Sequence, residues 1–320
     1  MKNTSMVVGR NITIDIAKSI GILLMIVGHC WEIPYMPYRH IIFTFHMPLF
    51  FIISGYFFKN KDVKVSLVND AKHLLIPYFV TSLSIILILL IRAVFDDDYT
   101  QFIYYLKATF LGSGSKHPCI FFSNIPNIGA LWFFPALYIC KNVYNILPIN
   151  KKIRLIYSFI IYMCAYLLGR YVLFIPFSVL SGLSAIIFYA IGDNLKECNR
   201  ISKYYWIIGI ICWILSFKYS RISLVQPIMD LYIIDIIGAT TASILIYIIS
   251  KKLTGLNYLS KFLFWVGKNS MYILCFHLID LNIGISSLIC NNNNVILSLL
   301  PFPLISTYLF EKIKTQIKNK

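Results

Sequence analysis

Long apolar runs recur along the whole chain, and they limit its fold more than any other feature of the sequence. A helix needs about 20 mostly apolar residues to cross the hydrocarbon layer, and its backbone groups must be hydrogen-bonded within the segment. About ten runs approach this length: 12–31, 41–58, 73–95, 128–147, 154–172, 177–195, 204–218, 230–250, 269–290 and 295–310. A transmembrane β-barrel would show alternating segments of about ten residues instead. We therefore predict an all-α integral membrane protein with about ten transmembrane helices.

Composition and charge agree with this prediction. Hydrophobic residues make up 58% of the chain and charged residues 13%, and the mean hydropathy is +0.74, which is far from the composition of a soluble domain. The net charge of +16 does not indicate a nucleic-acid partner, because the basic residues alternate from one connecting segment to the next. Of the 29 Lys and Arg residues, 20 fall in the segments on the side of the two termini and 7 on the other side. Both termini are therefore expected in the cytoplasm.

The sequence indicates one domain over residues 1–320, with a cytoplasmic tail (1–11), a transmembrane bundle (12–310) and a second cytoplasmic tail (311–320). Two amphipathic pieces, 101–112 and 259–270, are expected as short helices at the membrane interface. The first apolar run contains an acid and a base and has no small-x-small site, so we expect no cleaved signal peptide. The cysteines have no zinc-type spacing, so we expect no metal. No glycine-rich phosphate motif indicates an ATP-driven pump.

Three ionisable side chains interrupt the first run, ITIDIAKSIGILLMIVGHCWE (12–32). Asp15, Lys18 and His29 share a helix face with Ile22 and Met25, because all five fall within roughly 80° around the axis. Lys18 and His29 lie about 16 Å apart along the axis, so the lysine is near the inner leaflet and the histidine near the outer one. Ionisable groups at this depth usually line a cavity or a bundle interior. We expect one cavity to join Lys18 and His29.

Such a cavity would hold an anionic donor at its cationic inner end and activate an acceptor near the histidine, whose pKa lies near neutrality. Each residue also has a purely structural explanation. Asp15 complements the helix dipole, Lys18 reaches the inner surface and His29 is satisfied by water. Their shared face favours the functional interpretation. Glu32 follows one turn beyond His29 and is a candidate contact for the acceptor.

The second run contains FTFHMPLFFIISGYFF (43–58), with His46 two residues before Pro48. Proline removes a backbone donor, so a distortion of the helix is expected close to His46. The adjacent Ser54 and Gly55 would permit close approach of another helix. His46 is either a wall of the same cavity or a hydrogen-bonded structural histidine.

Two further candidates are weaker. His277 and Asp280 stand one turn apart in the ninth run, where a hydrogen bond between them would orient the imidazole or only satisfy a buried pair. We favour the structural role and keep His277 as a third candidate acceptor contact. Trp132 lies near the predicted outer interface, where aromatic side chains are common.

Four segments resemble acyltransferase family 3, the bacterial integral-membrane acyltransferases, and in particular the short branch of sugar O-acetylases that includes fucose O-acetylase-like proteins. These segments are DIAKSIGILLMIVGH (15–29), FHMPLFFIISGYFF (45–58), LWFFPALY (131–138) and KNSMYILCFH (268–277). The first two are specific in order and spacing, and the other two support them. Members of this family are taken to transfer an acyl group, commonly acetyl from cytoplasmic acetyl-coenzyme A, to a hydroxyl of an envelope carbohydrate.

The resemblance implies roles for individual residues. The family's first helix bears an Arg or Lys and, after ten intervening residues, an essential histidine, which here are Lys18 and His29. His29 is thus expected to be catalytic and Lys18 to be the cation on the donor side. Arg10 matches an arginine common ahead of this helix, and the phenylalanine-histidine motif places His46 in the reaction cavity. Lysine stands where many relatives have arginine, so a bidentate grip on phosphate is not implied.

These roles combine into one expected function. Acetyl-coenzyme A would bind with its phosphates near Arg10 and Lys18, with Asp15 holding the lysine in place. The imidazole of His29 would act as a general base or carry the acyl group itself. The acceptor would be a polysaccharide or a lipid-linked glycan, contacted by Glu32, Trp132 and His277.

The expected location is the bacterial cell (inner) membrane, which the chain crosses several times. A transporter or a glycan or lipid flippase is the alternative, since it would also line a cavity with ionisable residues. A non-catalytic sensor or scaffold in the membrane is a third possibility. Transporters of the common folds carry internal repeats, and this sequence shows none.

Overall fold

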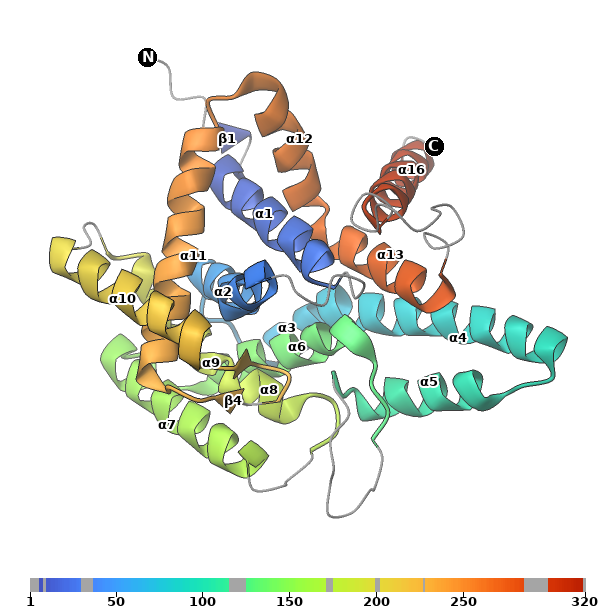
Figure 1. Ribbon diagram of the computed structural model, residues 1–320, viewed down its shortest axis with the longest axis horizontal. Helices are drawn as coiled ribbons and strands as arrows, with labels where there is room; N and C mark the ends of the chain where they lie inside the picture. Colours follow the sequence, from blue (N-terminus) through green and yellow to red (C-terminus); the bar gives the residue numbers. More distant parts are fainter. Residues whose placement is uncertain are drawn as a thin grey trace.

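The computed structural model describes residues 6–7, 10–29, 37–114, 125–170, 175–198, 202–226, 228–284 and 299–318. Within these residues the chain is predominantly helical, with two small antiparallel sheets of two strands each. Figure 1 shows the helices crossing at many angles, with α4 and α5 projecting together from the rest of the bundle.

The elements follow one another along the chain. The first half contains β1 (Met6–Val7), β2 (Arg10–Asn11), α1 (Ile12–Gly28), α2 (Pro37–Tyr56), α3 (Val63–Asp70), the π-helical turn η1 (Ala71–Leu75), α4 (Ile76–Asp96), α5 (Thr100–Leu111), the 3₁₀ turn η2 (Gly129–Trp132) and α6 (Phe133–Ile146). The second half contains α7 (Lys151–Arg170), α8 (Val179–Ser184), α9 (Ile186–Leu195), α10 (Lys203–Tyr219), β3 (Ile222–Ser223), β4 (Ile228–Met229), α11 (Ile233–Leu253), α12 (Asn257–Lys268), α13 (Ser270–Ile283) and α16 (Pro301–Lys318).

Each predicted apolar run overlaps a helix, but the number of membrane spans is not confirmed. Among the described residues, three segments are long and apolar enough to cross a membrane: Val63–Asp96, Lys151–Gly169 and Ile233–Leu253. The bent pair α12 and α13 would make a fourth. Several runs form shorter helices, for example α6 with 14 residues and α9 with 10. The cytoplasmic placement of both termini remains a prediction.

The third run begins earlier than its apolar residues indicate. The helix starts at Val63, because the carboxylate of Asp62 accepts hydrogen bonds from the backbone of Lys64 and Val65 at its N-terminus. It continues through η1 into α4 without a break. Residues 63–72 are too polar for hydropathy to reveal this extension. The two expected short amphipathic helices are present as α5 and α12.

Close backbone approaches fix α1 and α2 in the bundle. A Cβ on Gly55 of α2 would lie 2.0 Å from the carbonyl oxygen of Tyr189, and one on Gly192 of α9 would lie 2.0 Å from that of Ile52. Only glycine fits at such a crossing. Similarly, Gly267 of α12 lies directly against the backbone of Asp15 in α1. The packing expected at Gly55 is confirmed, and α2 stays helical through Pro48.

Helices α1 and α2 run antiparallel, so their ends form two distinct regions. Lys18 of α1 lies over the ring of Phe57, 5.9 Å from its centroid. At the other end, the ring of His29 lies 6.2 Å from that of Phe43 in α2. We refer to these regions as the lysine end (around Lys18 and Phe57) and the histidine end (around His29 and Phe43).

Candidate active site

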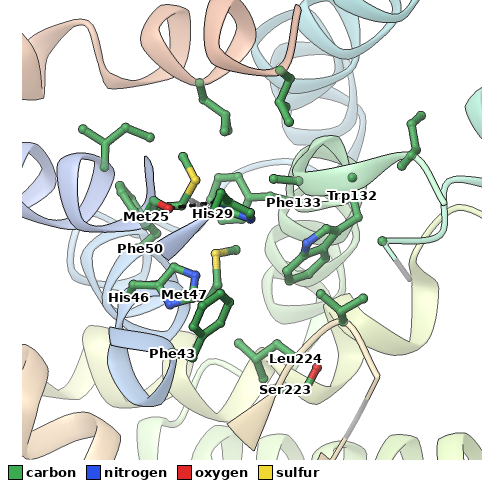
Figure 2. Close-up of a pocket in the computed structure, with 18 of the residues that line it drawn as sticks. Met25, His29, Phe43, His46, Met47, Phe50, Trp132, Phe133, Ser223 and Leu224 are labelled. Carbon is green, nitrogen blue, oxygen red and sulfur yellow. Dashed lines mark hydrogen bonds between the residues drawn. The ribbon is translucent and has the colours of Figure 1, made fainter. Parts of the chain in front are cut away.

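A cavity of about 490 Å³ lies at the histidine end. It is bounded by α1, α2 and α13, by the segment that leads into α6, and by the hairpin of β3 and β4. Figure 2 shows His29 and His46 facing this space, with the indole of Trp132 across from them. Most of the wall is apolar, and a few polar side chains reach it, which is the usual composition of a small-molecule site. The polar and charged lining residues are His29, Arg39, His46, Asn127, Ser223, Ser270 and Asn282.

His29 stands at the C-terminal cap of α1. Its backbone N–H completes the helix by donating to Met25 and Ile26. Its ring Nδ1 lies 2.8 Å from the carbonyl oxygen of Met25, as the dashed line in Figure 2 marks. A carbonyl only accepts hydrogen bonds, so Nδ1 carries the proton, and Nε2 of the neutral ring keeps its lone pair. The helix end thus orients the imidazole and leaves its basic nitrogen available.

His46 repeats this arrangement on α2. Its Nδ1 lies 3.0 Å from the carbonyl oxygen of Ile42, and the side chain is buried. The edge of its ring packs against Phe43, at a centroid distance of 4.9 Å. The same reasoning assigns the proton to Nδ1 and the lone pair to Nε2. Two helices therefore each present one similarly oriented basic imidazole nitrogen at the cavity.

The ring of His277 lies next to that of His29, with 5.9 Å between the ring centroids, but His277 does not line the cavity. It is fully buried, and neither ring nitrogen has a hydrogen-bond partner among the described residues. The hydrogen bond considered between His277 and Asp280 is therefore not formed, and that prediction is wrong. The cavity wall passes beside His277 through Leu274 and Leu278 of the same helix.

Trp132 is held in the wall by close packing. A Cβ on Gly114 would lie 2.3 Å from the indole ring, so only a glycine at that position leaves room for it. The edge of Trp132 also meets Phe133, with 6.4 Å between their centroids. Trp132 is 3% exposed and lines the cavity. Packing within the bundle therefore positions Trp132, in addition to the general preference of tryptophan for the membrane interface.

Arg10, Asp15 and Lys18 form a separate group at the lysine end. The buried carboxylate of Asp15 accepts from Lys18 Nζ at 3.1 Å and lies 3.5 Å from Nε of Arg10. The expected contact between Asp15 and Lys18 is thus present.

The single cavity expected to join Lys18 and His29 is not observed among the described residues. His29 lines the cavity, but Arg10, Asp15 and Lys18 do not. The cause is α12, which covers the first turns of α1 through Gly267. Only the later part of the predicted face, at Ile22 and Met25, remains open to the cavity.

Sequence analysis missed Arg39, whose guanidinium lies 5.3 Å from the ring centroid of Phe43 and lines the cavity. Arg39, Phe43 and His46 have the spacing of one helix face, which could have revealed the arginine if the helix had been started earlier than residue 41. Asn127 comes from an irregular segment and Ser223 from the two-residue strand β3, which are both too short to leave a periodic signal. Glu32, a predicted acceptor contact, lies outside the described residues.

The comparison with known families gives one match. A model of the acyltransferase domain (acyltransferase family 3) matches residues 11–310, which is nearly the whole chain. No curated protein and no solved structure matches the chain. The matched range contains α1, α2, α13 and all the residues that line the cavity. The chain therefore belongs to acyltransferase family 3 and is a multi-pass membrane acyltransferase.

Proposed function

We propose that the protein is an O-acyltransferase that moves an acetyl group from cytoplasmic acetyl-coenzyme A to a hydroxyl of a cell-envelope polysaccharide or lipid-linked glycan. The proposed location is the bacterial cell membrane. The observation that carries the proposal is the orientation of His29, whose Nδ1 is held by the carbonyl of Met25 while Nε2 is left as the base. The family match supports acyl transfer over transport.

In the proposed reaction, Nε2 of His29 removes the proton of the acceptor hydroxyl as its oxygen attacks the thioester carbonyl. A C–O bond forms, the C–S bond breaks, and the proton on the imidazole passes to the leaving thiolate, which departs as a free thiol. The same nitrogen would be the attacking atom if the acyl group passed through the histidine. His46 presents a second acceptor nitrogen, which we propose orients the hydroxyl.

The acceptor is proposed to lie against Trp132. Sugar rings present apolar C–H faces that pack on an aromatic side chain, and their hydroxyls bind polar groups at its border. Asn127 and Ser223 supply such groups in the cavity. Glu32 and His277 remain candidate acceptor contacts, and Arg10, Lys18 and Asp15 remain candidates for the donor side.

The test is acetyl transfer in isolated membranes supplied with acetyl-coenzyme A that carries a labelled acetyl group. Wild-type membranes should place label on glycan, and His29→Ala should abolish it while the protein still inserts. His73→Ala is a matched control, because His73 also contacts the carbonyl four residues earlier, at Asn69, but is exposed. It should transfer label like the wild type.

Two results would contradict the proposal. One is normal labelling by His29→Ala. The other is wild-type membranes that move unmodified glycan and leave no label on it, which is the behaviour of a flippase.

A further inference from the structure

A second hollow, of about 190 Å³, lies at the lysine end. It is formed where α2 ends and meets α3, α6 and α9. The lining residues are Ser54, Phe57, Phe58, Lys59, Lys61, Ser66, Asp70, Lys141 and Tyr189. We call the cavity at the histidine end the histidine cavity. No described residue lines both this cavity and the hollow at the lysine end, so they are separate. We refer to this hollow as the lysine pocket.

The lysine pocket carries a positive charge. Asp70 is the one acid in its lining, and it is already engaged, with Lys141 Nζ at 2.5 Å and the hydroxyl of Ser66 at 3.3 Å. Lys59 and Lys61 make no ion pair with another described residue. One acid against three lysines leaves an excess of positive charge in a small recess. Such a recess attracts an anion, and lysine ammonium groups bind phosphate as point charges.

The backbone that carries Lys59 and Lys61 is held in place. Asn145 of α6 accepts from the backbone N–H of Lys61 at 3.1 Å and donates to its carbonyl at 3.0 Å. Next to it, the buried Arg154 donates to Asn60 at 3.1 Å. Buried polar side chains thus clamp both sides of this short turn. These contacts hold the turn that presents Lys59 and Lys61 to the pocket.

The position of the lysine pocket relates it to the histidine cavity through α2. His46 lies ten residues before Tyr56, the last residue of α2, which corresponds to about 15 Å along the helix axis, and Lys59 follows three residues beyond that helix end. Lys18 also lies at the border, over Phe57. Lys18 is paired with Asp15, whereas Lys59 and Lys61 have no ion-pair partner among the described residues. The lysine pocket is therefore a better anion site than the position of Lys18.

We infer that the lysine pocket binds the phosphate-bearing nucleotide end of the acyl donor, whose extended arm would carry the thioester along α2 to the histidine cavity. This inference rests on the proposed function, because it assigns the donor's phosphates to a site of that reaction. The recognised chemistry is a phosphate ester. Both coenzyme A and the headgroup of an anionic phospholipid have this chemistry, and the assignment is to coenzyme A.

The first experiment measures binding of coenzyme A to the purified protein in nanodiscs of phosphatidylcholine. Lys59→Ala/Lys61→Ala should weaken binding by about tenfold or more, since two charge-assisted contacts are lost. Lys64→Ala is the matched control, because Lys64 is an exposed lysine of the same segment that does not line the pocket. It should bind like the wild type. Lys59→Arg/Lys61→Arg keeps the charge and should retain most of the affinity.

The second experiment compares two donors in acetyl transfer. Lys59→Ala/Lys61→Ala should raise the KM for acetyl-coenzyme A and leave transfer from acetyl-N-acetylcysteamine unchanged, because that thioester has no phosphate. The binding measurement does not depend on acetyl transfer. A wild-type protein that binds coenzyme A through these lysines but transfers no acetyl group would therefore refute only the proposed function.

Unchanged binding of coenzyme A by the double variant would overturn the inference. The same conclusion would follow if the variant lost only its binding of phosphatidylglycerol in mixed nanodiscs, since the occupant would then be a lipid headgroup.

Discussion

The two ends of the α1–α2 pair differ in the chemistry they present. The histidine end has a cavity of about 490 Å³ with a largely apolar wall, and its two histidines are oriented by backbone carbonyls. The lysine end has a pocket of about 190 Å³ whose lining includes three lysines and one aspartate. An apolar surround suits group transfer, because it excludes water and strengthens each polar contact. A charged pocket suits binding of an anion. The difference suggests that chemistry and donor binding are divided between the two ends.

Packed side chains separate the two ends. Ile14 and Ala17 of α1 form a buried cluster with Leu49 and Ile53 of α2. Phe51 of α2 is also fully buried. A donor that spans both regions therefore has to displace some of these side chains. Helix α2 reaches both ends, so a change in its packing should affect both of them. A change at one end should affect only that end.

Replacing Gly55 by Leu should have the largest effect and remove both functions together. A side chain there would meet the carbonyl oxygen of Tyr189, which belongs to the backbone of α9 and cannot move aside. We expect a loss of more than about 3 kcal/mol in stability, the upper range for overpacked sites. The measurement is the yield of monodisperse protein after detergent extraction, followed by its thermal unfolding.

Gly255→Leu is the control for this change, since the nearest atom to a Cβ there is 3.6 Å away. It should give wild-type yield. A Gly55→Leu protein that is as stable as the wild type would show that the α2–α9 contact does not hold the two ends.

His46→Ala should lower acetyl transfer by about 10²–10⁴-fold, the usual contribution of a positioned acid–base group. Binding of coenzyme A should not change, because His46 lies at the histidine end. The experiment measures both quantities on one preparation. His40→Ala is the control, since His40 is an exposed residue of the same helix. If His46→Ala retained transfer, or lost coenzyme A binding, the division between the ends would be incorrect.

His277→Phe should have the smallest effect. It removes two buried ring nitrogens that have no partner among the described residues, so the protein should be at least as stable as the wild type. Transfer should fall by less than about tenfold, a modest share of what a positioned acid–base group contributes. The measurement is the rate at limiting and at saturating acceptor. A loss as large as that of His46→Ala would place His277 among the reacting groups.

Sequence analysis identified the helices and both cavity histidines for physical reasons. Apolar length marks most of the helices, and the i,i+4 geometry that ties His29 to Met25 follows from the helix itself. The separation of Lys18 from His29 was not predictable, because it depends on α12 lying over Asp15, a contact between residues far apart in the chain. The lysine pocket was hidden for a similar reason. Lys59 and Lys61 look like ordinary inner-loop charges until Asn145 binds the backbone of Lys61 and Arg154 binds the side chain of Asn60 between them.

The most direct test of the account is made on purified His29→Ala, with coenzyme A binding and acetyl transfer measured on the same sample. The account predicts that the variant binds coenzyme A as the wild type does and transfers label at least about 10²-fold more slowly. Transfer at the wild-type rate would contradict the role of His29. Loss of coenzyme A binding together with transfer, in a protein that remains folded, would contradict the separation of the two ends.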